Sequence, residues 1–333
     1  ASKRNGLVEV DLRNGRCTTL YNLPKDVRPT NLTYDANKSL WLSTTNGLVC
    51  YSFDTCQSKV YYSDPSDQFS LSDSFITDVY KDRNGRLWVG TQYGGLDLSS
   101  PAHSNFTKCY TLSDGTSIEG AIVRCFAEDE SGNVWVATER MGLLKYSNGV
   151  LERYNADIPK TVLALLDDDE WLWIGSVKGI SRMDYATAAV RNYVHFDIEN
   201  TENRVLNIYK SHEGEIFAAT TIGVMKYDRS RDRFVMLTDL SGITMENMAE
   251  DGRGVLWLAS YSTGVYSYDI KNDSIKSHYS PQTADTPIPD MISSICVDVA
   301  DNTWVVGFSS GFFQYQRKDD SFREYSMDTL PSL

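Results

Sequence analysis

The residues best placed to do chemistry are carboxylates that stand at a fixed distance before an aromatic residue. In six places an acid precedes the aromatic by six positions, and these acids are Asp35, Asp82, Asp129, Asp167, Asp251 and Asp298. Paired carboxylates can hydrolyse glycosidic bonds, and clustered ones can bind a divalent cation. A reaction site requires groups that break a repeat, so acids that recur with one spacing indicate a repeated structural turn instead.

The fullest copies of this turn read Asp82-Arg-Asn-Gly-Arg-Leu-Trp88 and Asp129-Glu-Ser-Gly-Asn-Val-Trp135. Aspartate hydrogen-bonds its own backbone a few residues on, and glycine adopts a positive φ, so the segment predicts a tight turn between two strands. The fourth copy, Asp167-Asp-Asp-Glu170, lacks the glycine and carries extra acids. A plain turn is the first interpretation of this cluster, and cation binding is its alternative.

The other groups that bind metals or react as nucleophiles are scattered. The four histidines are His103, His195, His212 and His278, and the six cysteines are Cys17, Cys50, Cys56, Cys109, Cys125 and Cys296. No Cys-x-x-Cys pair occurs, and the histidines lack the spacing of a zinc site. We therefore expect no metal, no cofactor and no catalytic residue. Cys50 and Cys56 lie at the two ends of one predicted strand pair, and their disulfide state stays open.

The elements that position these residues follow from a repeat. The aromatic returns seven times at intervals of 38 to 47 residues, at Trp41, Trp88, Trp135, Trp173, Phe217, Trp257 and Trp304. A short β-rich run follows it, then a second glycine, and four residues later usually a tyrosine. Each unit predicts four strands, here called a to d, with the acid turn between strands a and b. A period of about 40 to 50 residues suits a four-stranded propeller blade.

The sequence therefore predicts an all-β fold, a seven-bladed β-propeller of four-stranded antiparallel blades. Residues 23–333 hold the seven repeats, which we expect to form one domain. Residues 1–22 match strands c and d alone and predict a half-blade. This half-blade either closes the propeller as an extra strand pair or remains from a neighbouring propeller. An eight-bladed ring is the alternative.

Composition excludes some partners. The net charge is −13 and the sequence pI is about 4.8. A field of this sign repels nucleic acid and anionic membranes, so we expect neither as a partner. No run of 18 apolar residues is present, so the sequence predicts no transmembrane helix and a membrane link only through segments outside this chain.

The unit Asp-x-x-Gly-x-Leu-Trp-Val-Gly-Thr-x-x-x-Gly-Leu-x-x-Tyr, clearest at 82–98 and 129–146, resembles the two-component regulator propeller repeat. The resemblance covers essentially the whole chain. Departures are local: Phe217 replaces tryptophan, Ser211 replaces aspartate, and Lys38, Glu170 and Asp301 replace the turn glycine. The repeat motif is structural, so it carries over no binding residue.

The resemblance implies a role and a location. Such repeats form the periplasmic sensor region of bacterial hybrid two-component systems of the Bacteroides type, in which propellers detect carbohydrate and a kinase lies elsewhere in the protein. The chain is then a non-enzymatic sensor propeller of a larger inner-membrane protein that regulates glycan use. Its expected partner is an oligosaccharide or another small glycan, with a homodimer formed through the full-length receptor. It binds the ligand directly or supports a neighbouring domain that does.

Variable residues on the b–c loops are candidates for a ligand-binding rim, because these loops vary while the framework repeats. The six candidates are Tyr93, Glu139, Arg140, Lys178, Tyr261 and Phe308. The aromatic members could stack on sugar rings, and the charged members could bind hydroxyl groups or a uronate carboxylate. Two other function classes stay open, namely a propeller glycosidase or lyase, and a scaffold that binds protein.

A second pattern concerns strand a, where the position four residues before the acid is polar in five repeats. These residues are Asn31, Asp78, Asn207, Asn247 and Ser294. A polar register in the innermost strand is typical of the wall of a water-filled channel. The alternative interpretation places these residues at the bottom of a ligand pocket.

Overall fold

The computed structural model describes residues 1, 6–11, 13, 16–35, 38–99, 105–154, 157–193, 204–282, 288–308 and 310–325. Regular structure in these ranges consists of β-strands and one short 3-10 turn, η1 (Thr238–Leu240). None of the described residues belongs to a helix that is long and apolar enough to span a membrane.

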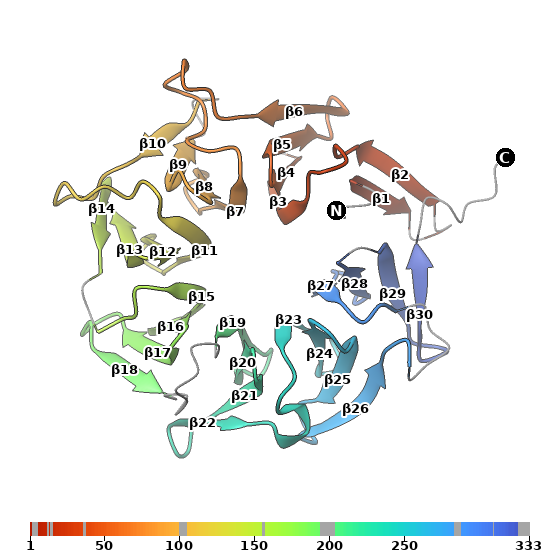
Figure 1. Ribbon diagram of the computed structural model, residues 1–333. Helices are drawn as coiled ribbons and strands as arrows, with labels where there is room; N and C mark the ends of the chain where they lie inside the picture. Colours follow the sequence, from red (N-terminus) through yellow and green to blue (C-terminus); the bar gives the residue numbers. More distant parts are fainter. Residues whose placement is uncertain are drawn as a thin grey trace. The chain divides into compact units, whose positions relative to one another are not determined.

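Seven four-stranded antiparallel sheets form the fold (Figure 1). Blades 1 to 4 are β3(Pro29–Asp35), β4(Ser39–Thr44), β5(Gly47–Ser52), β6(Gln57–Tyr61); β7(Ile76–Lys81), β8(Leu87–Thr91), β9(Leu96–Ser99), β10(Thr107–Cys109); β11(Ile122–Glu128), β12(Val134–Glu139), β13(Gly142–Ser147), β14(Val150–Arg153); and β15(Val162–Asp168), β16(Trp171–Ser176), β17(Gly179–Asp184), β18(Val190–Tyr193). Blades 5 to 7 are β19(Val205–Lys210), β20(Ile216–Thr220), β21(Gly223–Asp228), β22(Arg233–Met236); β23(Met245–Glu250), β24(Val255–Ser260), β25(Val265–Asp269), β26(Ser274–Tyr279); and β27(Ile292–Val297), β28(Thr303–Gly307), β29(Phe312–Gln316), β30(Ser321–Tyr325). The prediction of an all-β propeller with seven four-stranded blades is confirmed, and the eight-bladed alternative is not.

The chain divides into two compact units, one centred on Leu20–Ser176 and the other on Asn192–Leu333. The first unit holds blades 1 to 4, and the second holds blades 5 to 7. Near the amino terminus β1(Leu7–Asp11) and β2(Arg16–Tyr21) form a separate two-stranded sheet. That residues 1–22 serve as a half-blade, and that 23–333 act as one domain, stay predictions.

Strand a of every blade contains a β-bulge at the same place. The pairing register with strand b shifts between Pro29 and Asn31, Ile76 and Asp78, Val123 and Cys125, Val162 and Ala164, Val205 and Asn207, Met245 and Asn247, and Ile292 and Ser294. A bulge adds one residue, raises the local twist and re-aims the side chains beyond it. The seven blades thus repeat this irregularity together with their strand order.

The acid turns have the predicted geometry. In blade 3 one oxygen of Asp129 accepts the Asn133 backbone N–H at 3.0 Å, and the other accepts the Trp135 indole N–H at 2.9 Å. Blade 2 repeats the arrangement, with 2.8 Å for both bonds of Asp82. Each aspartate therefore closes its turn and also satisfies a buried indole, which explains why both residue types keep a fixed spacing.

The fourth turn departs from the predicted alignment. There Trp173 donates its indole N–H to Asp168 at 3.0 Å, five residues upstream, and not to Asp167. Asp167 instead accepts the Tyr185 hydroxyl at 2.7 Å. The assignment of Asp167 as the repeat acid is therefore wrong, because this turn is one residue shorter and Asp169 takes the positive φ of 55° that glycine supplies elsewhere.

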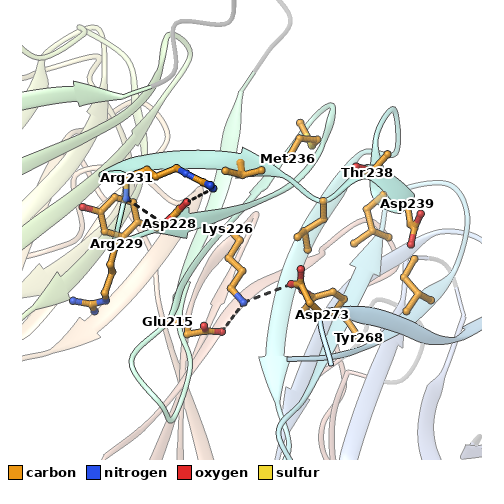
Figure 2. A pocket seen from close by; sticks show the side chains of 15 residues that line it. Glu215, Lys226, Asp228, Arg229, Arg231, Met236, Thr238, Asp239, Tyr268 and Asp273 are labelled. Carbon is orange, nitrogen blue, oxygen red and sulfur yellow. Dashed lines mark hydrogen bonds and ion pairs between the residues drawn. The ribbon is translucent and has the colours of Figure 1, made fainter. Parts of the chain in front are cut away.

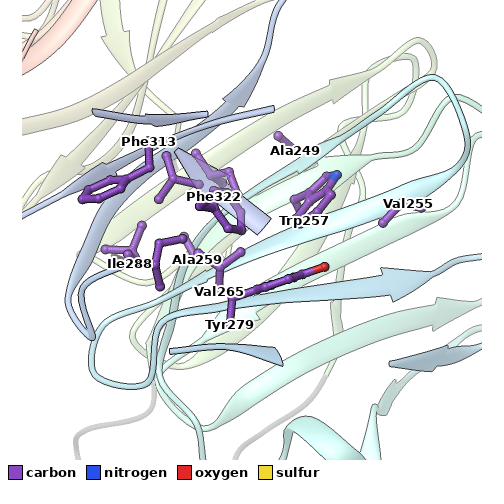
Figure 3. Close-up of a cluster of buried hydrophobic side chains, with 12 residues drawn as sticks. Ala249, Val255, Trp257, Ala259, Val265, Tyr279, Ile288, Phe313 and Phe322 are labelled. Atoms are coloured by element: carbon purple, nitrogen blue, oxygen red, sulfur yellow. The ribbon is translucent and has the colours of Figure 1, made fainter. Parts of the chain in front are cut away.

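Aromatic side chains of successive blades pack against one another. In blades 6 and 7 the buried rings of Trp257, Tyr279 and Phe322 lie together, with Tyr279 and Phe322 centroids 5.1 Å apart (Figure 3). In blades 2 and 3 the Trp88 ring meets Tyr146 edge-on at 4.7 Å. Rings of this size supply much of the apolar area that holds neighbouring sheets together. The repeated tryptophans and tyrosines are thus framework residues.

Candidate functional site

The b–c loops are held at their bases by a repeated hydrogen bond. The last threonine of strand b donates its hydroxyl to the carbonyl of the second glycine, as Thr91 does to Gly95 at 2.9 Å and Thr138 to Gly142 at 2.7 Å. Because the base is fixed, the residues between these two points project from the blade. Strand b and strand c therefore position the candidate rim.

Three of the rim candidates are exposed aromatic residues. Tyr93 follows β8, Tyr261 follows β24 and Phe308 follows β28, and their exposed fractions are 62%, 47% and 42%. The Tyr93 backbone N–H is bonded to Asp73 at 2.9 Å, which fixes the loop beneath the ring. A fixed, exposed ring suits stacking against a sugar face.

The charged candidates differ in their surroundings. Glu139 ends β12 and accepts the Arg124 Nε–H at 2.6 Å, so its carboxylate already has a cationic partner. Arg140 is exposed and has a φ of 76°, which places it at the tip of the turn. Lys178 is exposed between β16 and β17. Arg140 and Lys178 are thus both exposed at their loops.

The six candidates divide between the two units. Tyr93, Glu139 and Arg140 belong to the first unit, whereas Lys178, Tyr261 and Phe308 belong to the second. The structure fixes the surroundings of each residue within its own unit. A common binding surface made of all six stays a prediction.

A cavity lies elsewhere, in the second unit between blades 5 and 6 (Figure 2). It has a volume of about 720 Å³, within the range of small-molecule sites. Its wall combines charged and apolar side chains, among them Glu215, Lys226, Met236, Leu237, Asp273 and Ile275. We call it the blade 5–6 pocket. Sequence reasoning missed it.

Lys226 lies at the centre of this pocket. Its ammonium group is 3.0 Å from Glu215 and 3.5 Å from Asp273, and Figure 2 shows it between the two acids. It also lies 5.6 Å from the centroid of the Phe217 ring. Asp273 in turn accepts the Tyr268 hydroxyl. The pocket therefore presents a cation, two carboxylates and a phenol beside apolar side chains.

Two buried aspartates in the first unit have raised pKa values. Burial raises the pKa of Asp78 to about 7, although its carboxylate accepts hydrogen bonds from Asn31 and the Val79 N–H. Burial likewise raises the pKa of Asp97 to about 7, although the two hydrogen bonds that it accepts from Ser72 act to lower it. Asn31 and Asp78 are members of the polar register in strand a, and they bond to each other across blades 1 and 2.

The next question is whether the described side chains could bind a metal ion. Within the described ranges no group of three His, Cys, Asp or Glu side chains is arranged to hold a metal ion. The acid cluster of the fourth turn is used internally, since Asp168 binds the Trp173 indole and Asp167 binds the Tyr185 hydroxyl. These contacts favour the turn interpretation of that cluster.

Comparison with known families gives the repeat its identity. The sequence profile described as Two component regulator propeller matches residues 70–93 and 117–140, which contain strand a, the acid turn and strand b of blades 2 and 3. These two segments carry the two component regulator propeller repeat. The resemblance seen in the repeated motif is thereby confirmed. No curated protein matched the chain.

Solved structures share the fold of this repeat protein. The extracellular domain of a protein assigned to the one component systems of B. thetaiotaomicron is 18% identical, with a TM-score of 0.51 over 97% of this chain and 52% of that one. The designed protein Ika8 has a TM-score of 0.62 at 12% identity, over 85% of this chain and 81% of the designed one. Virginiamycin B lyase from Staphylococcus aureus has a TM-score of 0.51 at 11% identity, over 91% of this chain and 85% of the lyase. The chain thus spans about half the length of the bacterial extracellular domain.

Proposed function

We propose that this chain is the extracytoplasmic sensor propeller of a bacterial two-component receptor, and that it binds a carbohydrate without cleaving it. The observation that carries the proposal is the match of two consecutive repeats to the two component regulator propeller. A structural relative of similar fold is an extracellular domain, which supports a place outside the cytoplasm, in the periplasm. The kinase and the membrane segment would lie in other parts of the protein.

The rim residues support recognition of an oligosaccharide. Tyr93 and Tyr261 present exposed rings on anchored loops, and stacking on such rings is how apolar sugar faces bind. Arg140 and Lys178 add accessible donors that suit hydroxyl groups or a uronate. The sugar bound, and its use in regulating glycan utilisation, belong to this proposal.

The commitment of the repeated acids supports binding without turnover. Hydrolysis of a glycoside requires two carboxylates that are free to exchange protons with substrate and water. Asp82, Asp129 and Asp298 each hold an indole N–H and a turn N–H instead. Among the rim candidates Glu139 is the acid, and Arg124 engages it.

Calorimetric titration of the chain with defined oligosaccharides, neutral and acidic, tests this function, with each sample then checked for cleavage products. We expect saturable binding and intact sugar. Tyr93→Ala and Arg140→Ala should each weaken binding about 5- to 150-fold, the span of a loss of 1 to 3 kcal/mol. Tyr34→Ala is the matched control, because Tyr34 is 60% exposed but lies in strand a near an acid turn.

Each outcome separates the function classes. Cleavage that is lost in Glu139→Gln would establish a glycosidase in place of a sensor. Binding that is unchanged in both rim variants would overturn the rim as the site. Failure to bind any sugar, together with capture of a second protein or self-association, would favour the scaffold.

A further inference from the structure

One tyrosine of strand d recurs at a fixed register, opposite the residue that follows the second glycine. It is Tyr61 opposite Leu48, Tyr154 opposite Leu143, Tyr279 opposite Val265 and Tyr325 opposite Phe312. Its ring lies beside the repeated aromatic of its own blade, with centroids 5.8 Å apart for Tyr61 and Trp41 and 5.4 Å apart for Tyr154 and Trp135. This register tyrosine therefore fills the gap toward the next blade.

In three places the hydroxyl of a strand-d tyrosine bonds to the c–d turn of the next blade, namely that of Tyr154, Tyr193 and Tyr279, whereas the hydroxyl of Tyr325 bonds to Gln314 of its own blade at 2.8 Å. Tyr279 of blade 6 donates to Asp320 of blade 7 at 2.6 Å, and Tyr315 of blade 7 donates to the same oxygen at 2.6 Å. In blade 5, Asp232 accepts Tyr193 at 2.7 Å and Tyr227 at 2.5 Å. An aspartate in the c–d turn thus accepts two tyrosine hydroxyls, one from each side of the gap.

The tyrosine is absent from blade 2, where Cys109 stands opposite Leu96, and from blade 5. The register residue of blade 5 is Leu237, whose N–H bonds to the Val224 carbonyl at 2.9 Å, in the position of the tyrosines elsewhere. Asp273 of blade 6 therefore accepts a hydroxyl from its own blade, Tyr268, and lacks the one that blade 5 would supply. Lys226 approaches Asp273 at 3.5 Å from the other side.

The gap with the tyrosine and the gap without it differ in the size of their cavities. Between blades 3 and 4, where Tyr154 is present and donates to the Ala188 carbonyl at 2.9 Å, the corresponding cavity measures about 240 Å³. Between blades 5 and 6, where Leu237 stands instead, it measures about 720 Å³. The blade 5–6 pocket thus lies where leucine stands in place of the tyrosine of the repeat and the aspartate that would accept its hydroxyl is kept.

We propose that the blade 5–6 pocket binds a six-membered ring bearing hydroxyl groups, with the ring in the place of the missing tyrosine and a hydroxyl on Asp273. Met236, Leu237 and Ile275 supply the apolar contact for the face of the ring. Lys226 and Glu215 supply a donor and an acceptor for further hydroxyls. Sugars and phenols share this chemistry, and the choice of a sugar as ligand rests on the function proposed above.

The test restores the tyrosine. In Leu237→Tyr the new ring occupies the pocket and its hydroxyl can reach Asp273, so the variant should have a raised Tm. Binding at the pocket, which is a site separate from the rim, should become at least tenfold weaker. The probes are the neutral oligosaccharides that bind the unaltered chain and, separately, phenol, titrated by calorimetry. Val150→Tyr is the matched control, since Val150 is 46% exposed on β14 of blade 3.

A second variant guards against misfolding of the first. Asp273→Asn keeps a residue that tolerates the positive φ of 53° at this position but removes the carboxylate. It should weaken binding of either probe several-fold, whereas Val150→Tyr should leave binding unchanged.

The outcomes separate this inference from the proposed function. Sugar binding whose affinity and number of sites are unchanged in Leu237→Tyr and Asp273→Asn would overturn the pocket and leave the sensor proposal standing. Phenol binding that Leu237→Tyr abolishes, with no sugar bound, would uphold the ring site and count against the carbohydrate function. A chain that binds neither sugar nor phenol overturns the inference.

Discussion

Trp135 donates its indole N–H to Asp129, six residues upstream, at 2.9 Å, and both residues are buried. The bond joins strand b to the turn that precedes it. The other oxygen of Asp129 accepts the Asn133 backbone N–H at 3.0 Å. A single carboxylate thus satisfies two donors that water reaches poorly, and this explains the repeated spacing.

Removal of this carboxylate should destabilise the protein. In Asp129→Ala the indole N–H and the turn N–H lose their acceptor, and leaving buried donors unpaired costs about 2 to 4 kcal/mol of the free energy of unfolding. Urea denaturation measures the loss. The neighbouring exposed residue gives the control, Glu130→Ala, which should change stability by about 0.5 kcal/mol or less. Equal stability of the two variants would contradict this role.

Tyr279 should show separable contributions from its hydroxyl and its ring. Tyr279→Phe loses the bond to Asp320 and should cost about 1 kcal/mol. Tyr279→Leu also loses the contacts with Trp257 and Phe322, and should cost about 3 kcal/mol in all. Chemical denaturation of both variants gives the comparison. Tyr34→Phe, at a residue 60% exposed, should have no measurable effect, and a similar loss there would refute the assignment.

Two glycines with positive φ should respond very differently to alanine. A Cβ at Gly264 (φ 88°) would lie 2.2 Å from the Tyr279 carbonyl oxygen, whereas one at Gly254 (φ 74°) would meet nothing within 4 Å. Gly254→Ala should therefore cost the backbone strain alone, about 1 to 2 kcal/mol. Gly264→Ala adds a clash with main chain and should cost several kcal/mol or prevent folding. Thermal unfolding ranks the pair, and the reverse order would refute the packing described.

Stability should fall with rising pH through the ionisation of Asp78. Burial raises the pKa of Asp78 from 3.8 to about 7, so between these values the folded state retains a proton that the unfolded state has released. The folded state binds more protons there, and the free energy of unfolding therefore decreases as pH rises from about 4 to about 7. Below this window the contribution is constant, and above it the loss is complete.

The side chain introduced by Asp78→Asn cannot ionise, so this variant should lack the decline. The slope of the free energy of unfolding against pH should become more positive by at most about 1.4 kcal/mol per pH unit. Urea denaturation at several pH values between 4.5 and 7 measures the slope. Asp26→Asn, at an exposed aspartate, is the control and should leave it unchanged. Identical slopes for Asp78→Asn and the unaltered chain would show that another group governs this window.

Much of the blade could be predicted because its determinants are local. The acid and its aromatic lie six residues apart, and a glycine at positive φ closes the turn between them, so the pairing in Asp129 and Trp135 follows from the chain itself. The prediction for the fourth turn was wrong because three successive aspartates could each accept the indole N–H of Trp173. Backbone geometry alone decided that Asp168, and not Asp167, faces the Trp173 indole.

The sequence by itself determined the repeat, the turns and the all-β blades, because each depends on residues within one unit of about 40 to 50 positions. Tertiary structure decided where space remains. Leu237 is an ordinary apolar residue in the sequence, and only the structure shows that it lines a cavity together with Tyr268 and Asp273 of the facing blade. A cavity is set by the fit between two surfaces far apart in the chain, and local patterns do not record that fit.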